Sequence, residues 1–512
     1  MNKWFPLVML LILLAGMALR IPRLAERPLH HDEANQAYRF GLLLEDGVYE
    51  YDADDHHGPT LYYLTLPVSW ITGVKTFADS VEGTYRSVPV VFGLLLILAI
   101  PLLRCGLGTT SVCTAALFTA ISPGMAYYSR FYIQESLLVF FTFMAIAGGW
   151  RSIQIGSRFW AIVAGLSIGL MFATKETAII AYAAMFGAAL LCALVAHTTH
   201  FPLKNMALGL IFALLIAFLL FSSFMTNMNG PVDAVLAFKG YFARGTGMDT
   251  DHVHPWNFYL RMLTRYQFDG GPRWSEGLFF GLGLLGCIAI LRKKLPPEID
   301  LGLARFIMFY TILLTLAYSV ISYKTPWCIL SFLHGWILLA GIAVASILNC
   351  CADKITIPSA VRSVKIVLFL LLGWPVYKTY RLAENTVFRY AADYRNPYVY
   401  AHTAPDFKNL IRRIDEMAAV SPEGKEMYVQ VIAAPDSTWP LPFYLRRFPN
   451  VGYWTDATEV PGEIKPSLVI AGPDFESDPE EFLTEFYSLR QDTLLSLHID
   501  RTLWDAFIET RK

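Results

Sequence analysis

Charged residues are scarce in this chain of 512 residues. Asp, Glu, Lys and Arg make up 16% of it, whereas soluble proteins average about 25%. Hydrophobic residues account for 55%, and the 41 basic residues nearly cancel the 42 acidic ones. Because no basic stripe with interleaved aromatic residues is present, we expect no nucleic-acid partner. The composition favours a protein that is largely embedded in a membrane.

Cysteines are also few, and the C-terminal part of the chain has none. All seven lie between Cys105 and Cys351. A disulfide framework after that point is therefore excluded. The same C-terminal part lacks a phosphate-binding glycine loop and a nucleophile motif, and no internal repeat is visible.

Long apolar runs dominate the first three quarters of the sequence. A hydrocarbon core about 30 Å thick requires about 20 apolar residues in a helix. Eleven runs approach that length and predict an all-α polytopic membrane bundle. They cover residues 5–21, 85–103, 111–127, 135–150, 159–173, 177–196, 205–225, 276–291, 301–321, 327–348 and 362–377. The shorter stretch 61–74 predicts an interfacial or re-entrant helix, and the first run also has features of a signal peptide.

Lys and Arg in the short loops predict the orientation of the chain. If the N-terminus is cytoplasmic, one set of loops collects most of the basic residues, as cytoplasmic loops do. These residues are Lys3, Arg104, Arg151, Arg158, Lys204, 292–294, Lys354, Arg362 and Lys365. We therefore expect a multi-pass protein of the plasma or inner membrane. Its membrane domain would span 1–379, with loops 22–84 and 226–275 on the extracytoplasmic side.

Residues 380–512 are charged and predict a small soluble α/β domain on that same side. Helical periodicity marks 406–420, and 478–490 is expected to form a second helix. The apolar stretches 427–434 and 467–471 predict buried strands. Alternating helices and strands are typical of a layered α/β fold.

The first extracytoplasmic loop is dense in ionisable residues. Asp32 and Glu33 come soon after the first apolar run, before a predicted helix at 33–44. Charges beside a membrane are expensive unless they serve a site. The alternative is that Asp32 only caps that helix.

Three further loops on the same side carry charges. Cations there run against the positive-inside trend, so an anionic ligand such as a phosphate is attractive. The alternatives are interface anchoring and weak surface ion pairs. The residues are Arg130 and Glu135, Lys175 and Glu176, and Tyr323 and Lys324.

Several loop residues could also hold a divalent metal. Their carboxylates and imidazoles suit Mg²⁺ or Mn²⁺. Their spacing matches no established zinc pattern, and the favoured interpretation requires no cofactor. The candidates are Asp52, Asp54, His56, His57 and His254.

The order of these motifs resembles the GT-C superfamily of membrane glycosyltransferases. It is similar to the branch of protein O-mannosyltransferases and lipid A aminoarabinose transferases, and within it to Agl-type proteins associated with flippase activity. The segments that carry the resemblance are 31–34, 51–52, 57–59, 129–130 with Glu135, 175–177, 323–327 and 439–446.

The resemblance implies a transfer of a hexose or pentose from a polyprenyl-phosphate donor, among membrane lipids, to a hydroxyl of a protein, glycan or lipid. Asp32 would be the general base of an inverting reaction, with Glu33 orienting it or the acceptor. Cations would bind the donor phosphate, and three further residues would support them. The cations are Arg130, Lys175 and Lys324, and the supporting residues are Glu135, Glu176 and Tyr323.

Three alternatives remain at this level. A transporter or flippase would carry charges at mid-membrane and often inverted repeats, whereas these charges gather in loops on one side. A non-catalytic assembly subunit would tolerate replacement of Asp32. A metal-dependent oligosaccharide transferase would use Asp52 and Asp54.

Overall fold

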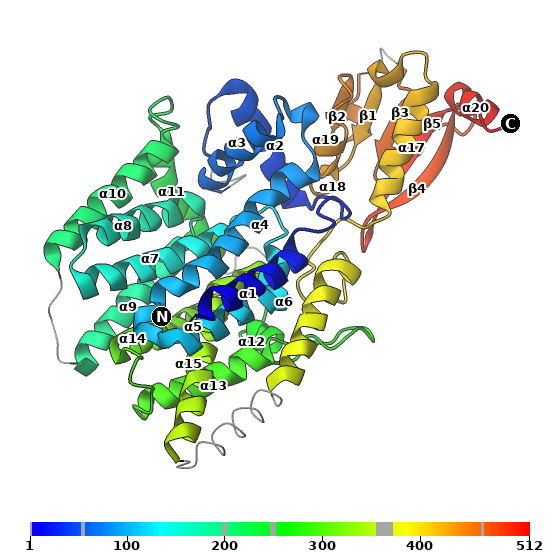
Figure 1. Cartoon of the computed structure of the whole chain (residues 1–512). Helices are drawn as coiled ribbons and strands as arrows, with labels where there is room; N and C mark the ends of the chain where they lie inside the picture. Colours follow the sequence, from blue (N-terminus) through cyan, green and yellow to red (C-terminus); the bar gives the residue numbers. More distant parts are fainter. Residues whose placement is uncertain (1–2, 53–56, 197–201, 246–251, 355–371, 462–464) are drawn as a thin grey trace.

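The structure is a computed structural model that describes residues 3–52, 57–196, 202–245, 252–354, 372–461 and 465–512. A helical bundle forms most of the chain, and a smaller sheet domain lies at one end of it (Figure 1). This arrangement confirms the predicted fold class, a polytopic bundle followed by a small α/β domain.

The bundle consists of apolar helices that lie side by side. In the described residues, six helical segments are long and apolar enough to cross a membrane, and three shorter apolar helices accompany them. The principal helices are α1 (Phe5–Arg20), α4 (Glu82–Ala99), α5 (Arg104–Ile121), α7 (Glu135–Ile155), α8 (Arg158–Thr174), α9 (Ala178–Ala196), α10 (Leu203–Phe221), α13 (Gly277–Leu291), α14 (Leu301–Val320) and α15 (Leu330–Lys354). They correspond to ten of the eleven predicted runs. The eleventh, 362–377, falls outside the described residues up to 371, and 372–384 are helical.

One predicted span is divided in two. The run 111–127 predicted a single helix, but α5 ends at Ile121 and a separate helix, α6 (Pro123–Tyr128), follows. Ser122 between them is extended, and its Oγ accepts a hydrogen bond from Met125 N at 3.3 Å. Ser–Pro favours this break because serine caps the new helix and Pro123 has no N–H to continue the old one.

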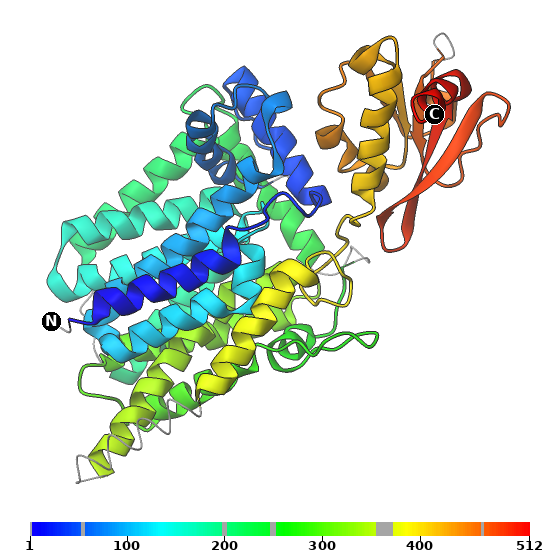
Figure 2. The ribbon, with the colours of Figure 1, turned by 45° about the vertical axis from the view of Figure 1, so that its right-hand side comes forward.

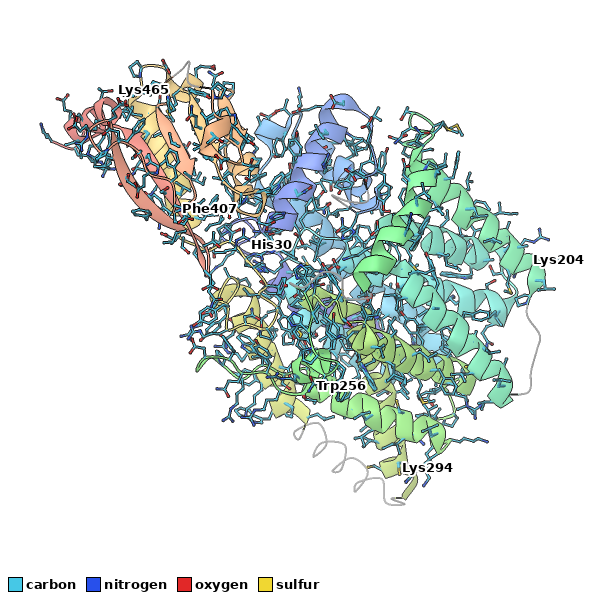
Figure 3. The ribbon with its side chains drawn as sticks, turned by 180° about the vertical axis from the view of Figure 1, so that it is seen from behind. His30, Lys204, Trp256, Lys294, Phe407 and Lys465 are labelled. Atoms are coloured by element: carbon cyan, nitrogen blue, oxygen red, sulfur yellow. The ribbon has the colours of Figure 1, made fainter. Side chains whose placement is uncertain are left out.

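Short helices at one end of the bundle carry the loop residues. The predicted helices at 33–44 and 61–74 are confirmed as α2 (His31–Asp46) and α3 (Thr60–Thr72). Loop 226–275 contains α11 (Gly230–Gly245) and α12 (Phe258–Thr264). Lys204 and Lys294 lie at the opposite end of the molecule from the sheet domain (Figure 3). The two sets of loops therefore separate as the orientation prediction requires, and the side that each end faces stays a prediction.

The C-terminal domain is a five-stranded sheet in the order β2-β1-β3-β5-β4. Its first three strands pair in parallel, and β5 joins β3 and β4 in antiparallel fashion. The helices α17 and α20 pack against its core. The elements are α17 (Phe407–Val420), β1 (Val429–Ile432), α18 (Pro435–Thr438), α19 (Leu441–Tyr444), β2 (Val451–Trp454), β3 (Leu468–Ala471), β4 (Phe482–Arg490), β5 (Thr493–Asp500) and α20 (Arg501–Glu509).

The predicted helix at 478–490 is wrong, because residues 482–490 form strand β4. Leu483, Tyr487 and Leu489, which share one face of β4, pack into the domain core. Pairing with β5 through a tight connection satisfies its backbone. These tertiary contacts outweighed the helical preference of the acidic segment.

The sheet domain is fastened to the first loop (Figure 2). The Tyr444 hydroxyl accepts a hydrogen bond from Leu29 N at 2.9 Å and donates one to Glu82 at 3.0 Å. Thr403 Oγ1 donates to Leu29 O at 2.7 Å, and Arg446 donates to Ser80 O. The start of α2 is therefore held from both the bundle and the sheet domain.

Close packing of α8 on α10 depends on two glycines. A Cβ atom added to Gly165 would lie 2.1 Å from the carbonyl oxygen of Gly209, whereas one added to Gly149 on α7 would meet nothing within 4 Å. We expect Gly165→Ala to destabilise the bundle by about 1–3 kcal/mol because the helices must separate. Thermal unfolding in detergent measures this effect. Gly149→Ala is the matched control and should unfold like the wild type; equal unfolding of both variants would contradict the close contact.

Candidate active site

Helix α2 begins with a cap built by His30. Its ring nitrogen Nδ1 accepts a hydrogen bond from Asp32 N at 3.0 Å, and the Glu33 carboxylate accepts one from His30 N at 3.0 Å. This reciprocal arrangement satisfies the free N–H groups at the start of the helix. The alternative in which Asp32 itself is the cap is therefore wrong, and its carboxylate has no capping duty.

The Asp32 carboxylate has unusually few partners among the described residues. Its side chain is 37% exposed, and its nearest ionic neighbour, His30 Nδ1, lies 3.7 Å from Oδ1. No hydrogen bond to this carboxylate is made by any residue that the structure describes. Burial alone would raise the pKa of the Asp32 carboxyl, but the electrostatic effect of neighbouring groups outweighs burial and lowers the pKa below its ordinary value. These groups are His30, His31, His57 and Lys175.

Two neighbouring loops contribute buried ion pairs. Lys175 Nζ pairs with Glu135 at the start of α7, and both side chains are buried. His57 Nδ1 lies 2.8 Å from Glu176 Oε2, and the Tyr51 hydroxyl donates to Glu176 Oε1 at 2.7 Å. Burial would raise the pKa of Glu176, but His57 and Tyr51 bring it down to about 2.

Glu135 has one oxygen to spare. Its Oε1 is engaged by Lys175, but its buried Oε2 has no hydrogen-bond partner among the described residues. A buried acceptor without a donor is costly in a folded protein. A ligand hydroxyl that reached Glu135 would find this acceptor unoccupied.

Glu33 has a different environment from Asp32, although the two are adjacent. Arg86 donates to both Glu33 oxygens at 2.7 and 2.6 Å, and Arg27 donates to Oε2 at 3.0 Å. The backbone N–H groups of His30 and Tyr132 donate as well, each at 3.0 Å. Burial opposes ionisation, but Arg27 and Arg86 lower the pKa of Glu33 to about 2. Both oxygens are saturated within the protein, so Glu33 positions the loop.

Two of the predicted phosphate ligands direct their donors at backbone carbonyls. Arg130 donates to Arg20 O at 2.9 Å, Pro22 O at 2.6 Å and Arg23 O at 3.1 Å. Lys324 donates to Ile321 O, and to His254 O at 3.3 Å. Of the three predicted cations, Lys175 is the one whose charge acts on Asp32. A role for Arg130 and Lys324 at a phosphate stays a prediction.

Tyr323 joins loop 226–275 to this region. It forms an antiparallel bridge with Val253, and its ring lies 4.9 Å from that of His252. The ring of His252 lies 5.5 Å from that of Tyr400, whose carbonyl oxygen is 2.9 Å from His30 Nε2. Tyr323 is therefore connected to the cap of α2 through His252 and Tyr400, and its supporting role stays a prediction.

The metal candidates are only partly described. Asp54 and His56 lie outside the described residues, whereas Asp52, His57 and His254 lie within them. His57 is committed to Glu176, and the His254 ring stacks on Phe258 with centroids 4.4 Å apart. In the described ranges, no three His, Cys, Asp or Glu side chains form a group that could hold a metal ion. We therefore assign no step to a metal.

Sequence reasoning missed three residues that shape the site. Arg27 and Arg86 neutralise Glu33, and Trp439 of the sheet domain lies beside α2, 6.1 Å between ring centroids from His31. The arginines had a signal, because basic residues at the predicted extracytoplasmic end of a span run against the positive-inside trend. Trp439 lies in the segment 439–446 that carries the resemblance, but its position beside α2 could not be predicted, since its neighbours come from distant parts of the sequence.

Comparisons with known proteins were made for both sequence and structure. Neither a protein-family model nor a curated protein matches the sequence. Two kinds of solved structure match nearly the whole chain. ArnT from Cupriavidus metallidurans bound to undecaprenyl phosphate has 15% identity and a TM-score of 0.64, over 98% of this chain and 99% of its own. The archaeal oligosaccharyltransferase AglB from Archaeoglobus fulgidus, in complex with an inhibitory peptide and a dolichol-phosphate, has 14% identity and a TM-score of 0.58, over 99% of this chain and 77% of its own.

The chain has the GT-C fold. At this level of identity the likeness concerns the arrangement of the backbone, and it agrees with the resemblance read from the motifs. Another AglB structure, with 15% identity and a TM-score of 0.56, is a complex with zinc and sulfate. The apolar helices of this chain form its membrane part.

The Glu33 cluster should contribute strongly to the stability of this chain. We expect Glu33→Gln to lower the free energy of unfolding by about 3–5 kcal/mol, because two buried guanidinium groups lose their counter-charge. Unfolding in detergent followed by circular dichroism measures the loss. Glu26→Gln is the matched control, since Glu26 forms only an exposed pair with Arg23 at 3.6 Å and should change stability by less than about 1 kcal/mol.

The pH dependence of stability provides a second test of the Glu33 cluster. The folded pKa of Glu33 is about 2, below the unfolded value of about 4.3. Its stabilisation is therefore complete above the unfolded pKa and is lost as the pH falls toward 2. Glu33→Gln should lack this part of the acid transition. An acid transition identical to that of the wild type would contradict the role of Glu33.

Proposed function

We propose that this protein is an inverting glycosyltransferase embedded in the membrane. It transfers a sugar from a polyprenyl-phosphate carrier to an acceptor hydroxyl on the extracytoplasmic face. Two structures with the same fold support the carrier class, because ArnT is bound to undecaprenyl phosphate and AglB to a dolichol-phosphate. The sugar and the acceptor are left open.

The observation that carries the proposal is the state of Asp32. Of the four acidic side chains discussed above, Glu33 and Glu135 are held by cationic partners, and Glu176 is held by hydrogen bonds. Asp32 is partly exposed and ionised and accepts no hydrogen bond from the described residues. A general base must be charged and able to reach the proton that it removes, and Asp32 meets both conditions.

The reaction that we propose needs no cofactor. The acceptor oxygen attacks the anomeric carbon while the bond from that carbon to the phosphate oxygen breaks. The acceptor proton passes to the Asp32 carboxylate, and the polyprenyl phosphate departs with the bonding electrons. Positive charge develops at the sugar in the transition state, and the Asp32 carboxylate also stabilises that charge.

Lys175 and Glu135 are well suited to hold the donor. The Lys175 ammonium acts on Asp32 from the turn between α8 and α9, where it can offset the charge that grows on the leaving phosphate. Glu135 Oε2 offers a buried acceptor for a sugar hydroxyl. We assign Glu176 the role of holding His57. Both carboxylate oxygens of Glu176 are engaged, so neither is available to the substrate.

The C-terminal domain, residues 380–512, supplies a wall of the site in this proposal. The ring of Trp439 lies 6.1 Å from that of His31 and 6.0 Å from that of Tyr38, both on α2. Indole rings offer a large flat apolar face with one polar edge. Trp439 is thus a candidate surface for the acceptor or the sugar, next to the proposed base.

Replacement of Asp32 tests the assignment directly. We expect Asp32→Asn to reduce turnover of a labelled polyprenyl-phosphate-sugar panel by at least about 100-fold, because a general base contributes about 10²–10⁴. Thermal unfolding should stay near that of the wild type, since the carboxylate makes no hydrogen bond to the described residues. Asp46→Asn, at the exposed end of the same helix, is the matched control.

The pH profile and a chelator distinguish the alternatives. The pKa of Asp32 is lowered, so the base is ionised above its ordinary value of about 3.9, and the acid limb of kcat/KM should fall below that pH. Loss of turnover with EDTA would favour a metal-assisted transfer instead. Equal turnover by the wild type and Asp32→Asn would overturn the assignment of Asp32.

Trp439 should affect binding more than chemistry. We expect Trp439→Ala to raise KM for one substrate about tenfold with little change in kcat, because the lost contact does not involve the reacting atoms. Trp439→Phe should recover most of the effect by restoring a flat apolar face. Trp504→Ala, on α20 of the same domain, is the control. An unchanged KM in Trp439→Ala would show that Trp439 does not form part of the substrate site.

A further inference from the structure

A polar pocket lies beside the Glu33 cluster. It has a volume of about 190 Å³ and is formed by the connection from α1 to α2, the end of α6 and residues 387–392. Arg27 and Arg86, which hold Glu33, line the pocket, whereas Asp32, Glu135 and Lys175 do not. Its charged lining consists of Arg23, Arg27, Arg86, Arg130, Arg389 and Glu26.

The pocket carries an excess of positive charge. Five arginines line it, and the carboxylates paired with them are Glu26, which also lines the pocket, and Glu33. Burial and the charges of Arg27 and Arg86 lower the pKa of Arg130 to about 9. Buried charge of one sign is unfavourable unless a counter-charge is supplied.

One buried donor in the wall has no partner. Arg27 uses its Nη2 for Glu33 and for Arg130 O, whereas its Nη1 is buried and makes no hydrogen bond to the described residues. The rim adds donors that are not tied to the backbone. Arg23 holds only the exposed pair with Glu26, and Arg389 is exposed. Guanidinium groups on several sides match the oxygens of a tetrahedral anion.

The pocket lies where a lipid headgroup could enter. It begins directly after the end of α1, an apolar helix, and on its other side follows the helix at 372–384. Both helices run along the bundle, and their ends meet near the junction with the sheet domain (Figure 2). Headgroup phosphates lie at the ends of membrane-spanning helices.

We propose that this pocket, lined by Arg23, Arg27, Arg86, Arg130 and Arg389, binds a phosphate group at a site separate from Asp32. The phosphate is carried by a membrane lipid or is free in solution. When the phosphate is bound, it pairs with Arg27 and balances the positive charge of the arginines that Glu33 does not neutralise. This proposal does not depend on the assignment of Asp32 as general base, because Asp32 does not line the pocket.

Binding by the full chain in phosphatidylcholine nanodiscs tests the pocket. One arm measures radiolabelled inorganic phosphate at equilibrium. The other measures retention of phosphatidic acid, added to the same nanodiscs, by native mass spectrometry. We expect Arg23→Gln with Arg389→Gln to weaken binding at least tenfold, since each removes a charge-assisted donor from the rim. Neither side chain holds a backbone carbonyl, so the double variant should fold like the wild type.

Matched controls make the outcome decisive. Arg261→Gln with Arg273→Gln removes two exposed arginines from loop 226–275 and should bind like the wild type. Asp32→Asn should also bind normally, which separates failure of this proposal from failure of the transferase assignment. Weakening in the lipid arm alone identifies a lipid headgroup, and weakening in the phosphate arm alone identifies a free anion. No binding by the wild type, or equal binding by the rim variant, would overturn the proposal.

Discussion

The buried carboxylate of Glu33 is the interaction on which this end of the molecule depends. Arg86 from α4 and Arg27 from the first loop reach it, together with the backbone of His30 and Tyr132. The cluster joins the first loop to α4 and to the segment that leads into α7. Breaking such a cluster would leave charges buried without partners, so its geometry is stringently fixed.

Because Glu33 is held in this cluster, the adjacent acids Asp32 and Glu33 have different roles. Consecutive residues on a helix are about 100° apart around its axis, so Asp32 and Glu33 cannot face the same way. Glu33 turns into the ion cluster, whereas Asp32 is partly exposed and lies in the electrostatic field of His57 and Lys175. His30 completes the separation, because its ring caps α2 and relieves Asp32 of that task.

Much of the architecture could be predicted from local patterns. Apolar length found the membrane helices, and the alternation of apolar stretches found β1 and β3. The acidic segment that became β4 was misread because its conformation is decided by packing of its apolar side chains into the domain core, which distant segments complete. The predicted span 111–127 was drawn through Ser122 and Pro123, although that dipeptide is a local signal for a new helix. The first error needed tertiary information, and the second did not.

For the site, the sequence by itself determined which loops carry ionisable groups and that they meet on one side of a membrane bundle. Only the tertiary structure decided what each group does. Arg130 and Lys324 turn toward backbone carbonyls, Lys175 faces Glu135, and the arginines around Glu33 enclose a pocket. The physical reason is that a charge near a membrane takes whichever partner its neighbours leave available. Those neighbours are set by packing between segments far apart in the chain.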